Sequence, residues 1–243
     1  MSQLTLTQTQ ETEQTRSDWN RLTQLGGIVA WIQLACVLVT MVVMTIMGGE
    51  PSTAAEYYEA LNSGAAGLLR LDFTTLILLA LFPFLAMGIY AAFHRSRQAY
   101  AMLAMILIII GTLLALANHS AFSMMYLSDL YAAATTPAQQ AQLLTVGEAV
   151  IASDMWNTSA GFLAGIFMQG GFVFISFVML RSPGFSKWTA YTGVLSNGFD
   201  LVHVFVALFA PGLGFVLLAI GGVFYLIWFP LLGWDLIRLG NNS

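Results

Sequence analysis

The sequence predicts an all-α polytopic membrane protein, and three observations lead to this fold class. Hydrophobic residues make up 58% of the 243 positions and charged residues only 8%, whereas a soluble domain has about 25% charged residues. Six apolar stretches are long enough to cross a bilayer as helices, which takes about 20 residues each. Apolar and polar residues do not alternate with a period of two, and backbone groups must be paired in lipid, so helices are expected rather than strands.

The expected spans cover residues 25–47, 71–93, 99–124, 156–180, 188–209 and 212–237. Pro83 and Pro230 fall inside the second and sixth spans and are expected to kink these helices. Together the spans form one six-helix transmembrane domain, residues 25–239. Residues 1–24 are rich in Ser, Thr and Gln and have no apolar core, so we expect them to be a disordered cytoplasmic tail.

The distribution of positive charge predicts that both termini lie in the cytoplasm. Seven of the eight Lys and Arg residues fall on the side of the termini, and only Arg70 falls on the other side. Positively charged loops stay in the cytoplasm during insertion, which fixes the expected orientation. The expected location is therefore the cell membrane, as a multi-pass protein of a bacterial cytoplasmic membrane. The net charge of −4 gives no reason to expect nucleic acid as a partner.

Two loops on the predicted outer side carry signals for the start of a helix. Thr53 and Glu56 have the spacing of a capping box. Thr136 precedes Pro137, and Gln139 completes a similar cap. We expect two short interfacial helices on the outer face, where ordinary packing is favoured over movement as a lid.

One face of the fifth expected span carries a polar stripe in a chain with little other internal charge. The stripe consists of Gly193, Ser196, Asn197, Asp200 and His203. Carboxylates and imidazoles are costly in hydrocarbon, so this face is expected to turn toward the protein interior or a watery cavity. Asp200 and His203 are three residues apart and can touch on one helical face. Such a pair suits a proton relay or a general base, or it is an internally satisfied pair that helps helices associate.

Polar residues on other spans are expected at a similar depth, in the outer half of the membrane. Asn118 and His119 lie toward the outer end of the third span, and Asp72 and Asp154 begin the second and fourth spans. We therefore expect an outer-facing polar cavity between the second, third, fourth and fifth spans. The expected ligand-binding residues are Asp200, His203, Asn197, Asn118 and His119.

A metal site is an alternative use of the same residue types. Its ligands would be His119, Asp200 and His203, with Asp72 or Asp154 as a further ligand. These residues suit zinc, but no paired-histidine or Cys-x-x-Cys motif holds them together. Similarity to membrane zinc hydrolases of the ceramidase type ends at His and Asp residues on several helices. Haem held between His119 and His203 is a further alternative, and the sequence identifies no cofactor.

Several further polar residues are expected to serve packing. Gln33 and Gln169 fall near mid-depth and are expected to form a hydrogen bond across the first and fourth spans. Asp235 and Arg238 are expected to form an exposed pair at the cytoplasmic end of the last span.

Two segments resemble an uncharacterised bacterial family of multi-pass integral membrane proteins, catalogued as a domain of unknown function. The residues that carry the resemblance are Arg181, Pro183, Trp188 and Gly193 in one segment and Trp228, Pro230, Gly233, Leu236 and Arg238 in the other. The resemblance covers residues 22–239 and implies a bacterial inner-membrane protein. It implies no catalytic residues.

Three functional hypotheses follow from the sequence, and it does not decide whether the protein is an enzyme. The first is binding or transport of a small or lipid-like molecule in the outer polar cavity. The second is a metal-dependent membrane hydrolase acting on lipid. The third is a non-catalytic subunit of a membrane complex, with a small-residue face such as Gly161 and Gly165 against another chain. The expected partners are the lipid bilayer, a small-molecule or lipid ligand, and another chain in a homo- or hetero-oligomer.

Overall fold

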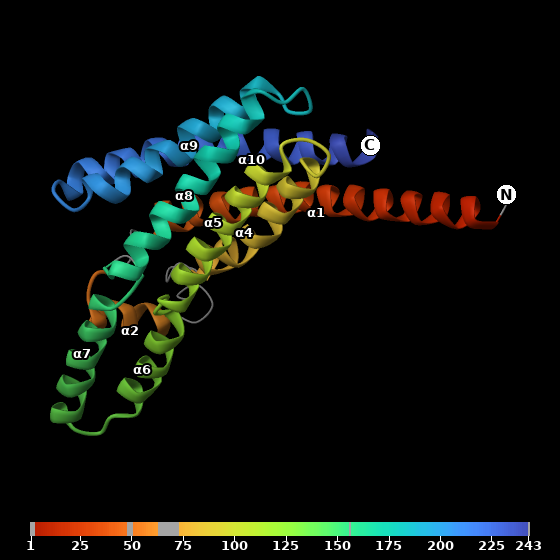
Figure 1. The fold of residues 1–243 in the computed structure, drawn as a ribbon. Helices are drawn as coiled ribbons and strands as arrows, with labels where there is room; N and C mark the ends of the chain where they lie inside the picture. The colour runs from red at the N-terminus through yellow and green to blue at the C-terminus, as the bar shows by residue number, and fades with distance from the viewer. Residues whose placement is uncertain (1–2, 48–50, 63–72, 156, 243) are drawn as a thin grey trace. The chain divides into compact units, whose positions relative to one another are not determined.

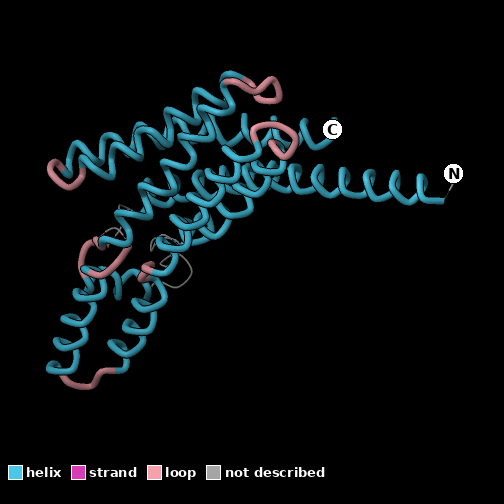
Figure 2. The backbone as a smooth tube through the Cα atoms, in the orientation of Figure 1, coloured by secondary structure: helices cyan, strands magenta, loops and turns pink. Residues whose placement is uncertain are grey.

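A computed structural model describes residues 3–47, 51–62, 73–155 and 157–242, and every regular element in these residues is an α-helix (Figures 1 and 2). The helices are α1 (Gln3–Met47), α2 (Ala54–Asn62), α4 (Phe73–Ala92), α5 (Gln98–Ala117), α6 (Ala121–Ala133), α7 (Pro137–Ala152), α8 (Ser159–Leu180), α9 (Lys187–Val206) and α10 (Pro211–Asn242). The predicted all-α fold class is therefore confirmed for the described residues.

Within the described residues, five segments are long and apolar enough to cross a membrane, judged by length and composition. They are Arg16–Val43 within α1, Phe73–Ala92, Gln98–Ala133 across α5 and α6, Ser159–Leu180 and Pro211–Asn242. The remaining expected span forms helix α9, which has 20 residues but is not among the five. Its Thr, Ser, Asn, Asp and His residues lower its mean hydropathy. Pro83 and Pro230 lie inside α4 and α10, as predicted.

Two helices differ from the expectation. Helix α1 begins at Gln3, within the segment expected to be a disordered tail. That segment contains neither Pro nor Gly, the two residues that disfavour a helix most, so nothing in it stops the helix. The third expected span is broken, because α5 ends at Ala117 and α6 begins only at Ala121. The polar residues Asn118, His119 and Ser120 form the break.

The chain divides into two compact units. The first unit comprises Met1–Leu34, Leu81–Ile109 and Phe167–Ser243, and the second comprises Ala35–Ala80 and Ile110–Ile166. Each helix pair below is described within one unit.

Close helix crossings and aromatic packing hold the first unit together. Helices α1 and α4 cross at Gly26 and Gly88, where a Cβ on Gly26 would lie only 2.7 Å from the Cα of Gly88. Helices α9 and α10 run side by side as an antiparallel hairpin (Figure 1). The core between α8 and α10 contains Phe172 and Trp228, whose ring centroids lie 5.5 Å apart and whose side chains are fully buried. These contacts fix the positions of α8, α9 and α10, which carry the polar stripe and its partners.

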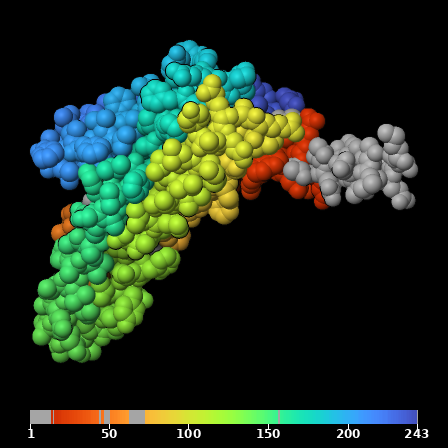
Figure 3. Space-filling model, in the orientation of Figure 1, coloured from red at the N-terminus to blue at the C-terminus, as the bar shows by residue number. Residues whose placement is uncertain are grey.

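In the second unit, α2 packs against the hairpin of α6 and α7. The atoms of α6 and α7 form one continuous surface in Figure 3. The Tyr58 hydroxyl of α2 donates to the carbonyl oxygen of Leu143 at 2.9 Å. Both predicted helix starts are present. Thr136 and Gln139 form the full capping box of α7, whereas the Glu56 carboxylate accepts from the backbone of Ser52. Whether these helices lie at a membrane surface stays a prediction.

Candidate functional site

The polar stripe on α9 faces the interior of the first unit. Ser196 and Asn197 are fully buried and Asp200 is 8% exposed. The side chains of α9 that are most exposed beyond its first residue are apolar or aromatic: Trp188, Tyr191, Leu195, Val202 and Phe205. The predicted inward orientation of the stripe is thus confirmed for its central residues, and the outer face of the helix is apolar and aromatic.

Asp200 lies in a cluster of four buried or partly buried polar side chains from three helices, which we call the Asp200 cluster: Gln169 of α8, Asn197 and Asp200 of α9, and Tyr225 of α10. The Tyr225 hydroxyl is the centre of the cluster. It lies 2.9 Å from Oδ2 of Asp200, 3.0 Å from Oδ1 of Asn197 and 3.1 Å from Oε1 of Gln169. Gln169 Nε2 donates to Asp200 Oδ2 at 3.3 Å. Gln169 thus forms its hydrogen bonds with side chains of α9 and α10, whereas the pairing expected from the sequence was with Gln33 of the first span.

The amide of Asn197 is oriented by the backbone of its own helix. Its Nδ2 donates to the carbonyl oxygen of Gly193 at 2.9 Å and to Oγ of Ser196 at 3.1 Å. With the nitrogen held in this way, Oδ1 faces Tyr225 and acts as an acceptor. The arrangement explains why the stripe contains Ser196 and Gly193, which contribute to the cluster through Asn197.

One oxygen of the Asp200 carboxylate has no partner. Oδ1 is buried and has no hydrogen-bond partner among the described residues, although Oδ2 has two donors within reach. It faces Gly221 of α10, where a Cβ would lie 2.6 Å from this oxygen. Only a residue without a side chain allows α10 to approach Asp200 so closely. An unpaired buried carboxylate oxygen is costly, and such groups are found at functional sites.

A second pair of unpaired polar atoms lies beside Gly193, about two helical turns from Asp200 along α9. Ser176 Oγ and Trp228 Nε1 are both buried without a hydrogen-bond partner among the described residues. Both lie against Gly193, where a Cβ would come within 2.5 Å of Trp228 Nε1 and closer still to Ser176 Oγ. The absence of a side chain at Gly193 therefore leaves two hydrogen-bond donors pointing toward the same small space.

The expected contact between Asp200 and His203 is wrong. Their side chains form neither a hydrogen bond nor an ion pair, because the two groups turn to different partners on α10. Helix α9 ends at Val206, and a short connection brings the first turn of α10 back beside it. His203 Nδ1 then lies 3.0 Å from the carbonyl oxygen of Gly214, while Asp200 meets the middle of α10.

Asn118 and His119 belong to the second unit and are satisfied locally in the break between α5 and α6. Asn118 Nδ2 donates to the carbonyl oxygen of Leu114 at 2.8 Å, and His119 Nδ1 accepts from the backbone N–H of Ala121 at 3.3 Å. Asp154 accepts from the backbone N–H of Ser120 at 2.7 Å and so caps the start of α6. These contacts explain the three polar side chains by helix geometry alone. Asp72, the other expected acidic ligand, lies outside the described residues.

No group of three or more His, Cys, Asp or Glu side chains in the described part of the chain is arranged to hold a metal ion. The proposed ligands His119, Asp200 and His203 each have the separate partners given above. The metal hypothesis and the haem hypothesis therefore receive no support from the described residues.

Tyr225 was missed by the analysis of the sequence, although a signal for it exists. It is a hydroxyl-bearing residue in an otherwise apolar segment of the last span, four residues after Gly221, and so shares a helical face with that glycine. A small residue that allows close approach, followed by a polar one on the same face, indicates an inter-helix polar contact.

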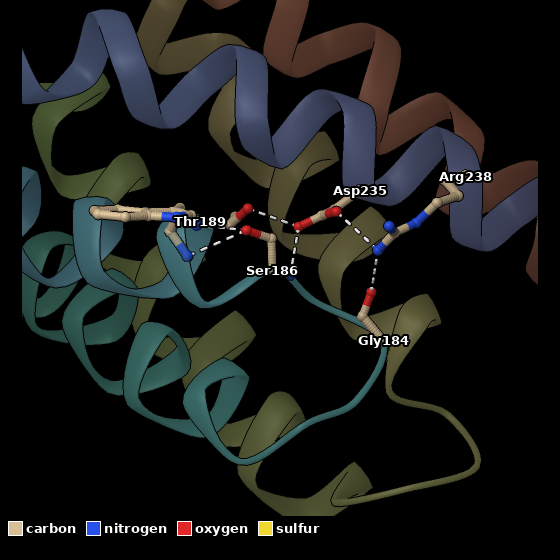
Figure 4. Close-up of polar contacts among 6 residues, drawn as sticks. Gly184, Ser186, Thr189, Asp235 and Arg238 are labelled. Carbon is tan, nitrogen blue, oxygen red and sulfur yellow. Dashed lines mark hydrogen bonds and ion pairs between the residues drawn. The ribbon is translucent and has the colours of Figure 1, made fainter.

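The expected exposed pair of Asp235 and Arg238 is wrong in one respect, because Asp235 is only 2% exposed. Figure 4 shows the polar contacts of Asp235. Its Oδ2 accepts from the backbone N–H of Ser186 at 2.8 Å and from the Thr189 hydroxyl at 2.6 Å. Arg238 pairs with its Oδ1 at 2.9 Å and also donates to the carbonyl oxygen of Gly184. Asp235 thus connects the end of α10 to the loop and first turn that begin α9.

Comparisons with known proteins identify no relative. No protein-family model matches the chain, and searches of curated proteins and of solved structures find no significant similarity. The resemblance to an uncharacterised bacterial membrane family gains no support from these comparisons. What the site can bind is therefore inferred from the residues that form it.

Proposed function

We propose that the chain is a six-span protein of a bacterial cytoplasmic membrane that binds or transports a small or lipid-like molecule at the Asp200 cluster. The five apolar segments support a membrane location by their length and composition. The sixth span in this proposal is α9. The polar side chains at its centre are buried against α8 and α10, and beyond Lys187 its exposed side chains are apolar or aromatic, which is the reverse of an amphipathic helix in water.

The distribution of charge supports the same number of spans. An even number of crossings places both termini on one side of the membrane, which agrees with seven of eight positive residues lying on that side. The α6–α7 hairpin would then lie on the outer side. Five crossings would separate the termini and divide these positive residues between the two sides.

The observation that carries the binding proposal is the unpaired Oδ1 of Asp200 beside a second oxygen that has two donors. The Asp200 cluster presents more acceptor oxygens than donor groups. A ligand that supplies a hydrogen-bond donor or a positive charge would complete it, whereas an acceptor-rich ligand would not. A small amine or a lipid with an amine or hydroxyl head group has this chemistry.

The five ligand-binding residues expected from the sequence therefore fall into two groups. Asp200 and Asn197 would contact the ligand, and His203, Asn118 and His119 would not, because backbone groups of their own chain occupy their side chains. The subunit hypothesis loses one of its supports. A Cβ on Gly161 would collide with the carbonyl oxygen of Met155, so this glycine serves packing within the chain.

The experiment that tests this function compares ligand-induced stabilisation in wild type and in Asp200→Asn. Purified full-length protein in detergent is screened for thermal stabilisation by small amines, hydroxylated lipids and amine-headed lipids. Binding at the cluster predicts stabilisation of the wild type that is lost in Asp200→Asn. The matched control is Asp129→Asn, the same change at an exposed carboxylate of α6, which should keep the stabilisation. Equal stabilisation of wild type and Asp200→Asn would contradict the proposed site.

A further inference from the structure

We infer that the Asp200 cluster is a proton-binding site, in which the Asp200 carboxyl group carries an exchangeable proton shared with Tyr225. This inference deepens the proposed function, because it rests on the same site and names the ligand that occupies the site when no other molecule does. A donor-bearing or cationic ligand would take the place of this proton.

The count of hydrogen atoms around Tyr225 is the first argument. Its hydroxyl has one proton, yet it lies within 3.1 Å of three oxygens that act as acceptors when Asp200 is ionised. Asn197 cannot supply a proton from the facing atom, because its nitrogen is held by Gly193. The amide nitrogen of Gln169 is likewise directed to Asp200, which leaves its oxygen toward Tyr225. With an ionised Asp200, two of the three contacts would bring lone pairs together.

A proton on Oδ2 of Asp200 removes most of this mismatch. The carboxyl O–H then donates to the Tyr225 oxygen over the observed 2.9 Å, and the Tyr225 hydroxyl is free to donate to Asn197 or Gln169. Two of the three contacts then contain a hydrogen atom, where an ionised Asp200 allows only one. The geometry is that of a neutral network with one more proton than the ionised form would hold.

The lack of a compensating charge is the second argument. Among the described residues, no Lys, Arg or His side chain lies within ion-pair distance of Asp200. Helix α8 presents Gln169 to it, helix α10 presents Tyr225 and Gly221, and His203 on its own helix is turned to Gly214. An ionised carboxylate without a positively charged partner is strongly disfavoured in a low-dielectric interior, and taking up a proton removes that cost.

Exchange of this proton requires only the breaking of the carboxyl O–H bond. The proton passes to a water molecule, the carboxylate keeps the electron pair, and the reverse step restores the neutral group. Ser176 Oγ and Trp228 Nε1 lie unpaired beside Gly193, toward the N-terminal end of α9. These groups extend the polar interior from Asp200 in that direction.

Infrared spectroscopy of the full-length protein in lipid nanodiscs tests the inference directly. At about pH 7, the difference between the spectra of wild type and Asp200→Asn should show the C=O stretching band of one protonated carboxyl group per chain. The band should move to lower frequency in D₂O, be lost in Asp200→Asn and persist in Asp129→Asn. In Tyr225→Phe it should remain but shift to higher frequency, because the carboxyl group loses its hydrogen-bond partner.

Two results would overturn the inference. One is a wild-type spectrum in which the Asp200-dependent signal is carboxylate alone from about pH 5 to about pH 9. The other is a protonated-carboxyl band that survives in Asp200→Asn. If Asp200→Asn fails to fold, wild type and Tyr225→Phe are labelled with ¹³C at the aspartate carboxyl instead. A protonated-carboxyl band that shifts between these two proteins then identifies Asp200. The infrared measurement needs no added ligand, so a failed ligand screen would not contradict the proton-binding site. Conversely, ligand binding in a protein that lacks this band would support the proposed function and contradict the proton-binding site.

Discussion

Tyr225 shows how a single hydroxyl can organise a polar interior inside apolar helices. Its ring packs on Phe229 and Trp228, with centroids 5.4 Å and 5.9 Å away, so the hydroxyl is held at a fixed height on α10. At that height it meets side chains from both α8 and α9. Aromatic packing thus determines where the polar contact occurs, and the Asp200 cluster depends on both.

Gly193 provides a test of how closely α8, α9 and α10 approach one another. In Gly193→Ala the new Cβ would come within 2.5 Å of Trp228 Nε1 and closer to Ser176 Oγ, both buried. We expect a loss of about 1–3 kcal/mol of stability from overpacking, measured by denaturant unfolding in detergent.

The matched control for this substitution lies on the same helix. Gly198 has nothing within 4 Å of the position that a Cβ would occupy. In Gly198→Ala we expect unchanged or increased stability, because Ala is the better helix former by up to about 1 kcal/mol. If both variants lost the same stability, the close approach at Gly193 would be refuted.

At the residue scale, the sequence identified the acid of the site but not its partners. Asp200 was recognisable because a carboxylate within an apolar span must find an interior environment. Its pairing with His203 was wrong, because spacing along one helix says which side chains can meet and not which neighbouring helix offers a better partner. Tyr225 and the direction of the Gln169 amide depend on the rotation of α8 and α10, which spacing does not determine.

At the scale of elements, Asp235 defines where α9 begins. The helix starts after Ser186, whose side chain accepts from the backbone N–H groups of Trp188 and Thr189. Asp235 then accepts from the Ser186 backbone and the Thr189 hydroxyl (Figure 4). A carboxylate at the start of a helix also interacts favourably with the helix dipole. The end of α10 therefore fixes both the loop and the first turn of α9.

Replacing Asp235 by Ala should loosen this junction. The change removes a charged acceptor from two donors and from Arg238, and we expect a loss of about 2 kcal/mol of stability. Limited trypsin digestion should also cleave faster after Arg181 and Lys187, on either side of the loop. The control Asp129→Ala, at an exposed position, should change neither readout. Unaltered cleavage in Asp235→Ala would show that the loop is held by other contacts.

The element boundaries were predictable where local chemistry decides them. The capping box of Thr136 and Gln139 was read from the sequence and is present. The break after Ala117 was not predicted, because apolar residues resume directly after the three polar residues that form it. It depends on Asp154, which lies 34 residues from Ser120 in the chain and caps α6 through it. The spacing of apolar residues along one helix does not predict a contact between residues so far apart in the sequence.

For the whole molecule, the testable statement is that the termini share one side of the membrane. Fusions of a cytoplasm-active fluorescent reporter to either end should both fluoresce, and fusions of a periplasm-active phosphatase at the same ends should both be inactive. A phosphatase inserted between Ala134 and Thr136, in the turn of the α6–α7 hairpin, should be active. Termini on opposite sides would mean that α9 does not cross the membrane.

The buried polar face and exposed apolar face of α9 have a consequence for how the protein is inserted into the membrane. A helix with an acid near its centre inserts poorly by itself, since an aspartate there costs about 3 kcal/mol during translocon-mediated entry. Its neighbour α10 is strongly apolar and carries Tyr225, which receives that acid. With α9 as the proposed sixth span, α10 must be synthesised before α9 can enter the lipid. Biogenesis of this protein would end with the two helices entering together, and chains truncated after Val206 would leave α9 outside.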